Sequence, residues 1–213
     1  MTNAFNDQEN RTTLQTESLQ PAMPQLQIPT HLKFGPFSIS SQVFHLSRTH
    51  LSYGLVNLKP ILPGHVLVCP VRVVPRISQL SVAETSDLFN TVRVVSRTLE
   101  RVYSASALNI AIQDGVDAGQ SVPHVHVHII PRQKGDYDHR GGGDQIYEAM
   151  DGVEGDVGKA FIEMQQLRNQ RMDHRKEFSV GPDSDRKPRS EEEMKKEAEW
   201  LRGEMEKDQE QDS

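Results

Sequence analysis

The sequence predicts an α+β fold, an antiparallel sheet of about five strands with two main helices. Short segments that are apolar or alternate between apolar and polar residues, separated by glycine and proline, are typical of strands in such a sheet. Two longer segments, near 82–103 and 190–206, have apolar residues at spacings of three and four, as amphipathic helices do. A chain of 213 residues has room for one domain of this kind and for tails.

Composition divides the chain into four regions. Residues 1–30 are rich in Gln, Thr, Ser and Pro and show little hydrophobic periodicity, which predicts a disordered leader. Residues 31–147 carry most of the strand and helix signals and are expected to form the main domain. Glycine and charged residues dominate 148–189, which predicts a flexible insertion with a short helix near 161–167. Residues 190–213 are expected to form a C-terminal helix and an acidic tail.

The first three strands are separated by clear breaks. The segments 43–46 and 52–57 are short and largely apolar, as expected of neighbouring antiparallel strands. Residues 59–64 contain two prolines and a glycine, which end regular structure and turn the chain. A third strand is expected at 65–70.

Each helix has a sequence signal for its first turn and an apolar stripe. Ser81 with Glu84, and Ser190 with Glu193, have the spacing of capping boxes, in which each side chain accepts a backbone N–H of the helix start. The stripes are Leu88, Val92, Val95, Leu99 and Val102 in the first helix and Met194, Ala198, Leu201 and Met205 in the second.

Two more strands are expected between the helices. Residues 108–113 alternate like a half-buried strand and lead into the glycine-bearing loop 114–119. The other strand is expected over 124–130 and should stop at Pro131.

This last strand contains three histidines in alternation, His124, His126 and His128. On an extended backbone alternate side chains share a face, so the three rings should form a row while the intervening Val125, Val127 and Ile129 enter the core. Neighbouring members of the row would be about 6 to 7 Å apart at the backbone.

The row is open to three interpretations. It could be a polar strand face satisfied by water. It could bind zinc, but the outer pair would lie about 13 Å apart, too far for one ion to collect all three rings, and no second cluster of metal ligands stands out. In the favoured interpretation, a backbone carbonyl holds one nitrogen of His126, and the other nitrogen is a nucleophile toward phosphorus. The flanking rings then donate hydrogen bonds to an anionic phosphate.

Charge and cysteine content limit the binding partners and the cellular compartment that we expect. A net charge of −6 argues against broad attachment to nucleic acid or to anionic membranes. Cys69 is the single cysteine, so no intrachain disulfide forms and a reducing compartment is expected. The N-terminus lacks a secretory signal, and no segment approaches the roughly 20 apolar residues that cross a bilayer. We expect a cytoplasmic location, with the nucleus as a second one left open.

The motifs resemble one known family. The run from His124 to Ile130 resembles the His-x-His-x-His-x-x signature of the histidine triad superfamily, in which x is apolar. Further motifs resemble its fragile histidine triad branch, the diadenosine triphosphate hydrolases: Leu55-Val56-Asn57, the run from Pro63 to Pro70, Gln113-Asp114-Gly115, and the run from Ala118 to Val122.

That resemblance implies a histidine triad fold, a homodimer and a reaction. His126 would form a nucleotidyl-histidine intermediate with the substrate, which water then hydrolyses. Diadenosine triphosphate would yield AMP and ADP, with Mg²⁺ or Mn²⁺ bound to the substrate phosphates and no organic cofactor. His124, His128 and His65 would support catalysis, while the implied substrate-binding residues are Asn57, Gln113, Gly119, Gln120, Ser121, Val122 and His128.

The sequence leaves some points open. Phe37 stands where this branch commonly has a polar residue near the nucleotide, which leaves one base or ribose contact open. Pro123 stands where a charged residue is common, which leaves the entry to the site open. The alternatives are a histidine triad adenosine phosphoramidase and a nucleotide-binding signalling module.

Overall fold

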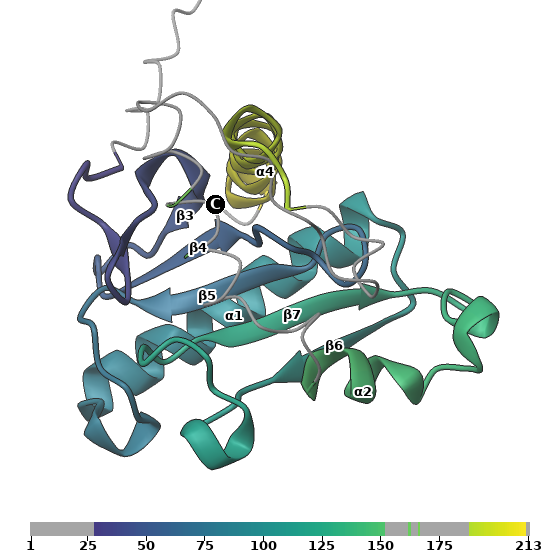
Figure 1. Cartoon of the computed structure of the whole chain (residues 1–213). Coiled ribbons are helices and arrows are strands. Elements are labelled where there is room, and N and C mark those ends of the chain that lie inside the picture. Colours follow the sequence, from purple (N-terminus) through teal and green to yellow (C-terminus); the bar gives the residue numbers. More distant parts are fainter. Residues whose placement is uncertain (1–27, 152–161, 163–165, 167–187, 212–213) are drawn as a thin grey trace, which may run out of the picture.

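A computed structural model describes residues 28–151, 162, 166 and 188–211 of the chain. Its centre is a five-stranded antiparallel sheet in the order β3-β4-β5-β7-β6, and a two-stranded hairpin, β1-β2, lies beside it (Figure 1). The strands are β1 Lys33–Phe34, β2 Phe37–Ser38, β3 Val43–Leu46, β4 Ser52–Val56, β5 Val66–Pro70, β6 Ala107–Ala111 and β7 Val127–Arg132. The predicted α+β class and the five-stranded sheet are confirmed.

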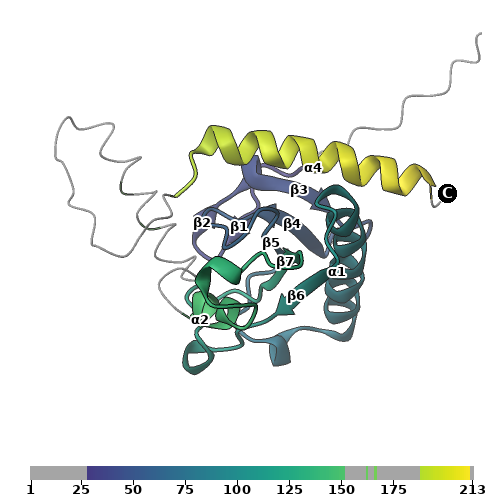
Figure 2. The same ribbon diagram turned by 90° about the vertical axis from the view of Figure 1, so that its right-hand side faces the viewer.

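The helices are α1 Val82–Val102, α2 Gln145–Asp151 and α4 Glu191–Gln211. Helix α1 covers one face of the sheet, while α2 and the β1-β2 hairpin lie on the opposite side (Figure 2). Helix α4 runs along the β3 side of the sheet and also contacts α1. No helix in the part of the chain that the structure describes is both long and apolar enough to cross a membrane.

The predicted apolar stripes form the contacts of α1 and α4 with the sheet. Their residues belong to the main core, with only Val102 partly exposed. Both capping boxes are present: the Glu84 N–H donates to Ser81 Oγ, and the Glu193 N–H donates to Ser190 Oγ. Helix α4 continues to Gln211, beyond the predicted end near 206.

The last strand differs from the prediction at both ends. Strand β7 begins at Val127 because the N–H of Val125 donates to the carbonyl of Val74, outside the sheet ladder. It also continues through Pro131 to Arg132. Strand β5 pairs with β7 only as far as Ile129, so beyond that residue β7 has β6 alone as a neighbour. The missing N–H of a proline costs no ladder hydrogen bond on such an unpaired side.

The predicted leader, residues 1–30, and the insertion, residues 148–189, fall mostly outside the described residues, as does most of the short helix near 161–167. The boundary predicted between 147 and 148 lies inside α2, where Ile146 and Met150 are buried in a second, smaller apolar cluster.

Candidate active site

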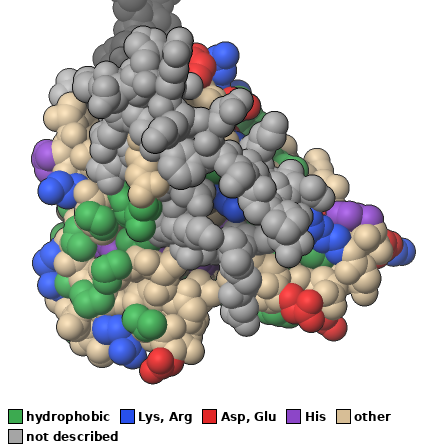
Figure 3. All heavy atoms as spheres, in the orientation of Figure 1, with side chains coloured by type: hydrophobic (Ala, Val, Ile, Leu, Met, Phe, Trp, Pro, Cys, Tyr) green, Lys and Arg blue, Asp and Glu red, His purple; other side chains and the backbone are tan. Residues whose placement is uncertain are grey.

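Four histidines meet in the interior of the domain. His65, His124, His126 and His128 are each at most 2% exposed. His65 stands directly before β5, and β7, which carries His128, pairs with β5. The apolar residues between the histidines enter the main core as predicted. Near the middle of the face seen in Figure 3, histidine side chains show only as small areas beside a group of hydrophobic side chains.

The three histidines of the motif do not form a row on one strand. Only His128 lies in β7, while His124 and His126 precede it. The ring of His124 is held by the protein at both nitrogens: the Gly35 N–H donates to Nδ1 at 3.1 Å, and Nε2–H donates to the Pro70 carbonyl at 2.9 Å. His124 therefore supports the site as part of its frame, because its ring reaches a ligand only by giving up one of these bonds.

His126 has the arrangement predicted for a nucleophile. Its Nδ1 lies 2.7 Å from the carbonyl oxygen of His124, which can only accept, so Nδ1 carries the proton. In the neutral ring Nε2 then keeps its lone pair, and no described residue donates a hydrogen bond to it. The Phe34 ring packs against that of His126 in a T-shaped arrangement, with centroids 5.2 Å apart. The backbone thus fixes which nitrogen of His126 can attack.

A second chain of hydrogen bonds fixes the proton of His128. The Ile61 N–H donates to His65 Nδ1 at 3.1 Å, so His65 carries its proton on Nε2. That Nε2–H donates to His128 Nδ1 at 2.9 Å, which leaves the His128 proton on Nε2. His128 Nε2 is buried and has no hydrogen-bond partner. The site therefore presents a lone pair on His126 beside an unpaired N–H donor on His128, with ring centroids 5.0 Å apart.

Burial keeps these rings neutral. Desolvation lowers the pKa of His126, and the hydrogen bond to the His124 carbonyl only partly opposes it. Desolvation also lowers the pKa of His128, and the nearby His126 and His65 lower it further. At pH 7 both rings are therefore neutral, so His126 Nε2 keeps its lone pair and His128 donates from a neutral N–H.

Asn57 lies behind His65. Its Oδ1 accepts the Lys59 N–H at 3.0 Å, which turns Nδ2 toward the ring of His65, 3.3 Å from Nε2 and 3.5 Å from Nδ1. Asn57 thus caps the turn that follows β4, and its role in substrate binding stays a prediction.

The remaining predicted residues lie in the loop before the histidines. Gln113 Nε2 donates to the Met150 carbonyl of α2 at 3.2 Å. Gly119 has a left-handed φ of +85°, which favours glycine, and a Cβ there would lie 2.8 Å from Gln113 Nε2, so a side chain would displace that amide. Gln120 Nε2 donates to the Pro75 carbonyl at 2.8 Å and to the His124 carbonyl at 3.4 Å. Val122 is buried in the core, and Ser121 is exposed. Their roles in substrate binding stay predictions.

No group of three His, Cys, Asp or Glu side chains is placed to hold a metal ion within the described residues. The residues that sequence reasoning missed are the backbone donors at Gly35 and Ile61 and the ring of Phe34. Every residue except proline has a backbone N–H, so the sequence does not indicate which of these groups will donate to a histidine.

The buried histidines give stability a defined pH dependence. Burial lowers the pKa of His45 and of His124 to about 4, although Asp87 raises that of His45 and the hydrogen bond to Pro70 raises that of His124. Below about pH 6.5 these two histidines become protonated in the unfolded chain but stay neutral in the folded chain. Their contribution to the free energy of unfolding is therefore complete above that pH and is lost progressively toward pH 4. At pH 5 the expected loss is on the order of 2 kcal/mol for each histidine.

Urea unfolding at pH 7 and pH 5 measures this loss. Carboxylates contribute little in this window, because the stability that depends on Glu84, whose pKa is lowered to about 2, is lost only below pH 4.5. Equal free energies of unfolding at the two pH values would contradict the assignment.

Known proteins resemble this chain in sequence and in fold. The HIT domain family model matches residues 39–135. A Schizosaccharomyces pombe protein named bis(5'-nucleosyl)-tetraphosphatase [asymmetrical] is 49% identical over 185 residues, which cover 86% of this chain and 99% of that protein. A Saccharomyces cerevisiae protein named bis(5'-adenosyl)-triphosphatase is 40% identical over 194 residues, which cover 81% of this chain and 91% of that protein.

Among solved structures, the Caenorhabditis elegans NitFhit protein superposes with a TM-score of 0.54 at 33% identity, over 81% of this chain and 30% of that one. The alignments with the two fungal relatives extend well beyond the histidine motif, over most of both chains. The chain belongs to the histidine triad family, within its fragile histidine triad branch.

Proposed function

We propose that this protein hydrolyses dinucleoside polyphosphates at a phosphoanhydride bond through a nucleotidyl-histidine intermediate. One observation carries the proposal: the lone pair of His126 Nε2 stands beside the unpartnered N–H of His128. A nucleophile next to a donor for a phosphate oxygen is what displacement at phosphorus requires. The names of the fungal relatives, a tetraphosphatase and a triphosphatase, support this class of substrate.

The reaction would proceed in two displacements. His126 Nε2 attacks the α-phosphorus, a P–N bond forms, and the bond from phosphorus to the bridging oxygen breaks, so that the remaining nucleotide leaves with its terminal phosphate. Water then attacks the same phosphorus and gives up a proton to the solvent, the P–N bond breaks with its electron pair returning to His126 Nε2, and the mononucleotide leaves. His128 Nε2–H donates to the α-phosphate oxygen in both steps. A divalent cation, Mg²⁺ or Mn²⁺, would enter bound to the substrate phosphates.

For diadenosine triphosphate, our proposed substrate, the products are AMP and ADP. The test is a comparison of kcat/KM for diadenosine triphosphate, diadenosine tetraphosphate and an adenosine phosphoramidate, each with Mg²⁺ and with EDTA. We expect the triphosphate to react fastest and EDTA to suppress its hydrolysis. Faster tetraphosphate hydrolysis would correct the chain length and keep the reaction class. Dominant phosphoramidate cleavage would replace the proposed function with that of a phosphoramidase.

We further propose a homodimer joined along β6. This strand is at the edge of the sheet, its outer side has no strand neighbour among the described residues, and its Ile110 is 49% exposed. A second copy pairing there would cover an otherwise open edge.

Sedimentation tests the dimer. The wild type is expected at twice the 24.1 kDa chain mass, and Ile110→Asp should shift it to the monomer because a charge enters the paired edge. Val82→Asp is the control, since Val82 is 89% exposed and lies in α1, outside the β6 edge. A monomeric wild type would refute this arrangement.

A further inference from the structure

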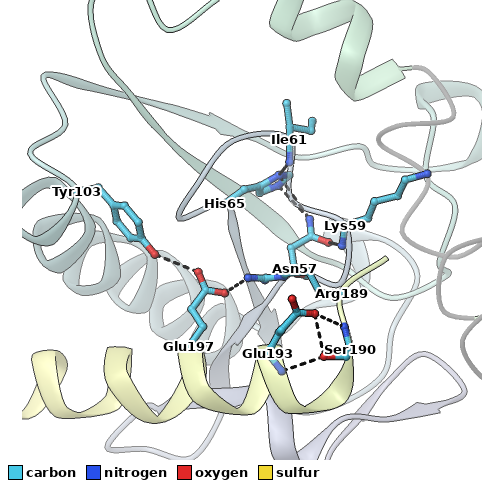
Figure 4. A network of polar contacts seen from close by, with 9 residues as sticks. All are labelled: Asn57, Lys59, Ile61, His65, Tyr103, Arg189, Ser190, Glu193 and Glu197. Carbon is cyan, nitrogen blue, oxygen red and sulfur yellow. Dashed lines mark hydrogen bonds and ion pairs between the residues drawn. The ribbon is translucent and has the colours of Figure 1, made fainter. Parts of the chain in front are cut away.

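The start of α4 is bonded to the loop that carries His65 (Figure 4). Arg189 comes directly before the helix cap, and its N–H donates to the Leu58 carbonyl at 3.0 Å. Its guanidinium donates to the Asn57 carbonyl from Nε, at 3.1 Å, and from Nη2. Its Nη1 makes an ion pair with Glu197 in α4. One side chain therefore holds both the first residue of the loop and the helix.

The far end of the same loop is held by Tyr103, which follows α1. A Cβ at Gly64 would lie only 2.5 Å from the Tyr103 ring, so the ring packs directly against the residue before His65. The Tyr103 hydroxyl donates to Glu197 at 3.0 Å, and the edge of Trp200 packs on its ring, with centroids 5.6 Å apart. Glu197 thus joins Tyr103 to Arg189 (Figure 4). Through these two residues it links the contact at Gly64 to the contact at Asn57.

These contacts lead to the reacting groups through the loop from Asn57 to His65. The Asn57 amide lies against the ring of His65, and the Ile61 N–H in the same loop sets the tautomer of His65. His65 in turn sets the proton of His128. If the loop shifted, the Ile61 N–H would leave Nδ1 of His65, and both rings could take either neutral tautomer.

The ion pair between Arg189 and Glu197 is partly buried, so it should stabilise this arrangement more than an exposed ion pair would. Arg189 and Glu197 have side chains only 20% and 16% exposed, so water screens their ion pair less than one at the surface. A guanidinium fork can bind a carbonyl and a carboxylate at once in fixed geometry, which an ammonium cannot do.

We propose that Arg189, joined by Glu197 to Tyr103, is a positioning residue of the active site. It touches neither substrate nor the reacting atoms, and it acts by fixing the loop that directs the His128 proton toward the phosphate. The inference rests on the proposed function, because it assigns the His128 donor to that reaction.

Arg101 offers a matched control. It also ties α4 to α1, through Glu204 and Asp208 at 2.7 Å each, but among the described residues it makes no hydrogen bond or ion pair with the loop 57–65. Arg189→Gln and Arg101→Gln each remove one arginine that holds α4 in place. We expect Arg189→Gln to lower kcat by about 10- to 100-fold with a smaller change in KM, since small misplacements of catalytic groups cost factors of this size. Arg101→Gln should stay within about twofold, and Arg189→Lys should fall between them.

A readout without substrate separates this inference from the proposed function. Nitrogen NMR of ¹⁵N-histidine protein reports which ring nitrogen carries the proton. Wild type and Arg101→Gln should show Nε2–H on His65 and His128, while Arg189→Gln should show mixed tautomers for both. Wild-type tautomers in Arg189→Gln, or equal losses of kcat in the two glutamine variants, would overturn the inference.

The experiment also covers a wild type without hydrolytic activity and an Arg189→Gln variant that does not fold. If the wild type hydrolyses no dinucleoside polyphosphate, the proposed function fails, and the NMR comparison still tests the hold on the loop. If Arg189→Gln does not fold, Arg189→Lys is measured in its place with the same two readouts, and unchanged tautomers together with unchanged kcat would then refute the proposal.

Discussion

Replacing His126 with asparagine is expected to abolish turnover while leaving the fold and ligand binding in place. The asparagine amide can still donate to the His124 carbonyl, which His126 Nδ1 does in the wild type. It has no counterpart of Nε2, however, so no P–N bond can form. Loss of a covalent nucleophile costs about 10⁴-fold or more in kcat, because only binding and charge stabilisation remain. Initial rates with diadenosine triphosphate measure the loss, and calorimetry with the same ligand measures binding.

The intermediate itself provides the sharper test. Mixing wild-type protein with substrate, quenching rapidly without acid and digesting the chain should yield a peptide that carries one nucleotide on His126. The His126→Asn variant should yield no such peptide. A nucleotide on another residue, or turnover by the variant within about 100-fold of the wild type, would contradict the assignment. A variant that binds without turnover and keeps a cellular effect would instead favour the signalling alternative.

The sequence predicts the fold well because periodicity reports burial. The alternation of His124 to Ile129 correctly places the valines and Ile129 in the core, and the stripes of α1 and α4 correctly predict their packing. The same alternation does not reveal where hydrogen bonding to a neighbouring strand begins. Val125 is buried like a strand residue, yet its N–H bonds to Val74 and not to β5, so the row of three rings was wrong as a description of one strand.

The chemistry of the site is less visible in the sequence than its location. The motif indicates which histidines meet, and the free nitrogen of His126 agrees with the interpretation from spacing. The proton positions on His65, His124 and His128 depend on backbone groups of Ile61, Gly35 and Pro70. Gly35 and Pro70 are 89 and 54 residues from His124 along the chain, whereas Ile61 is four residues before His65. In each case a main-chain N–H or carbonyl has the same chemistry whatever its side chain. Only the folded backbone shows them.

Removing the His128 donor is expected to have the second largest effect. His128→Leu deletes the only N–H found to face His126 without a partner among the described residues, and losing one such donor costs about 10²- to 10³-fold in kcat. The side chain is buried beside His126 and His65, so leucine keeps most of the packing but leaves the His65 Nε2–H without its acceptor, and some loss of stability is expected beside the loss of kcat. Thermal unfolding of each variant is the control, and a drop in kcat under about fivefold would contradict the role of His128.

Variants of His65 test whether catalysis needs the His128 proton on Nε2 or only the presence of the His128 ring. In His65→Leu the His128 ring remains, but no donor faces its Nδ1, so a fraction of the rings carries the proton there and presents a lone pair to the phosphate. His65→Gln offers an amide N–H to the same Nδ1 and should restore much of kcat. The expected order of kcat is wild type, His65→Gln, His65→Leu, His128→Leu. Because burial lowers the pKa of His128, a lower pH does not protonate both of its nitrogens. Acid therefore does not restore the Nε2–H donor in His65→Leu. Equal rates for the two His65 variants would show that the orientation of the His128 proton has no part in the reaction.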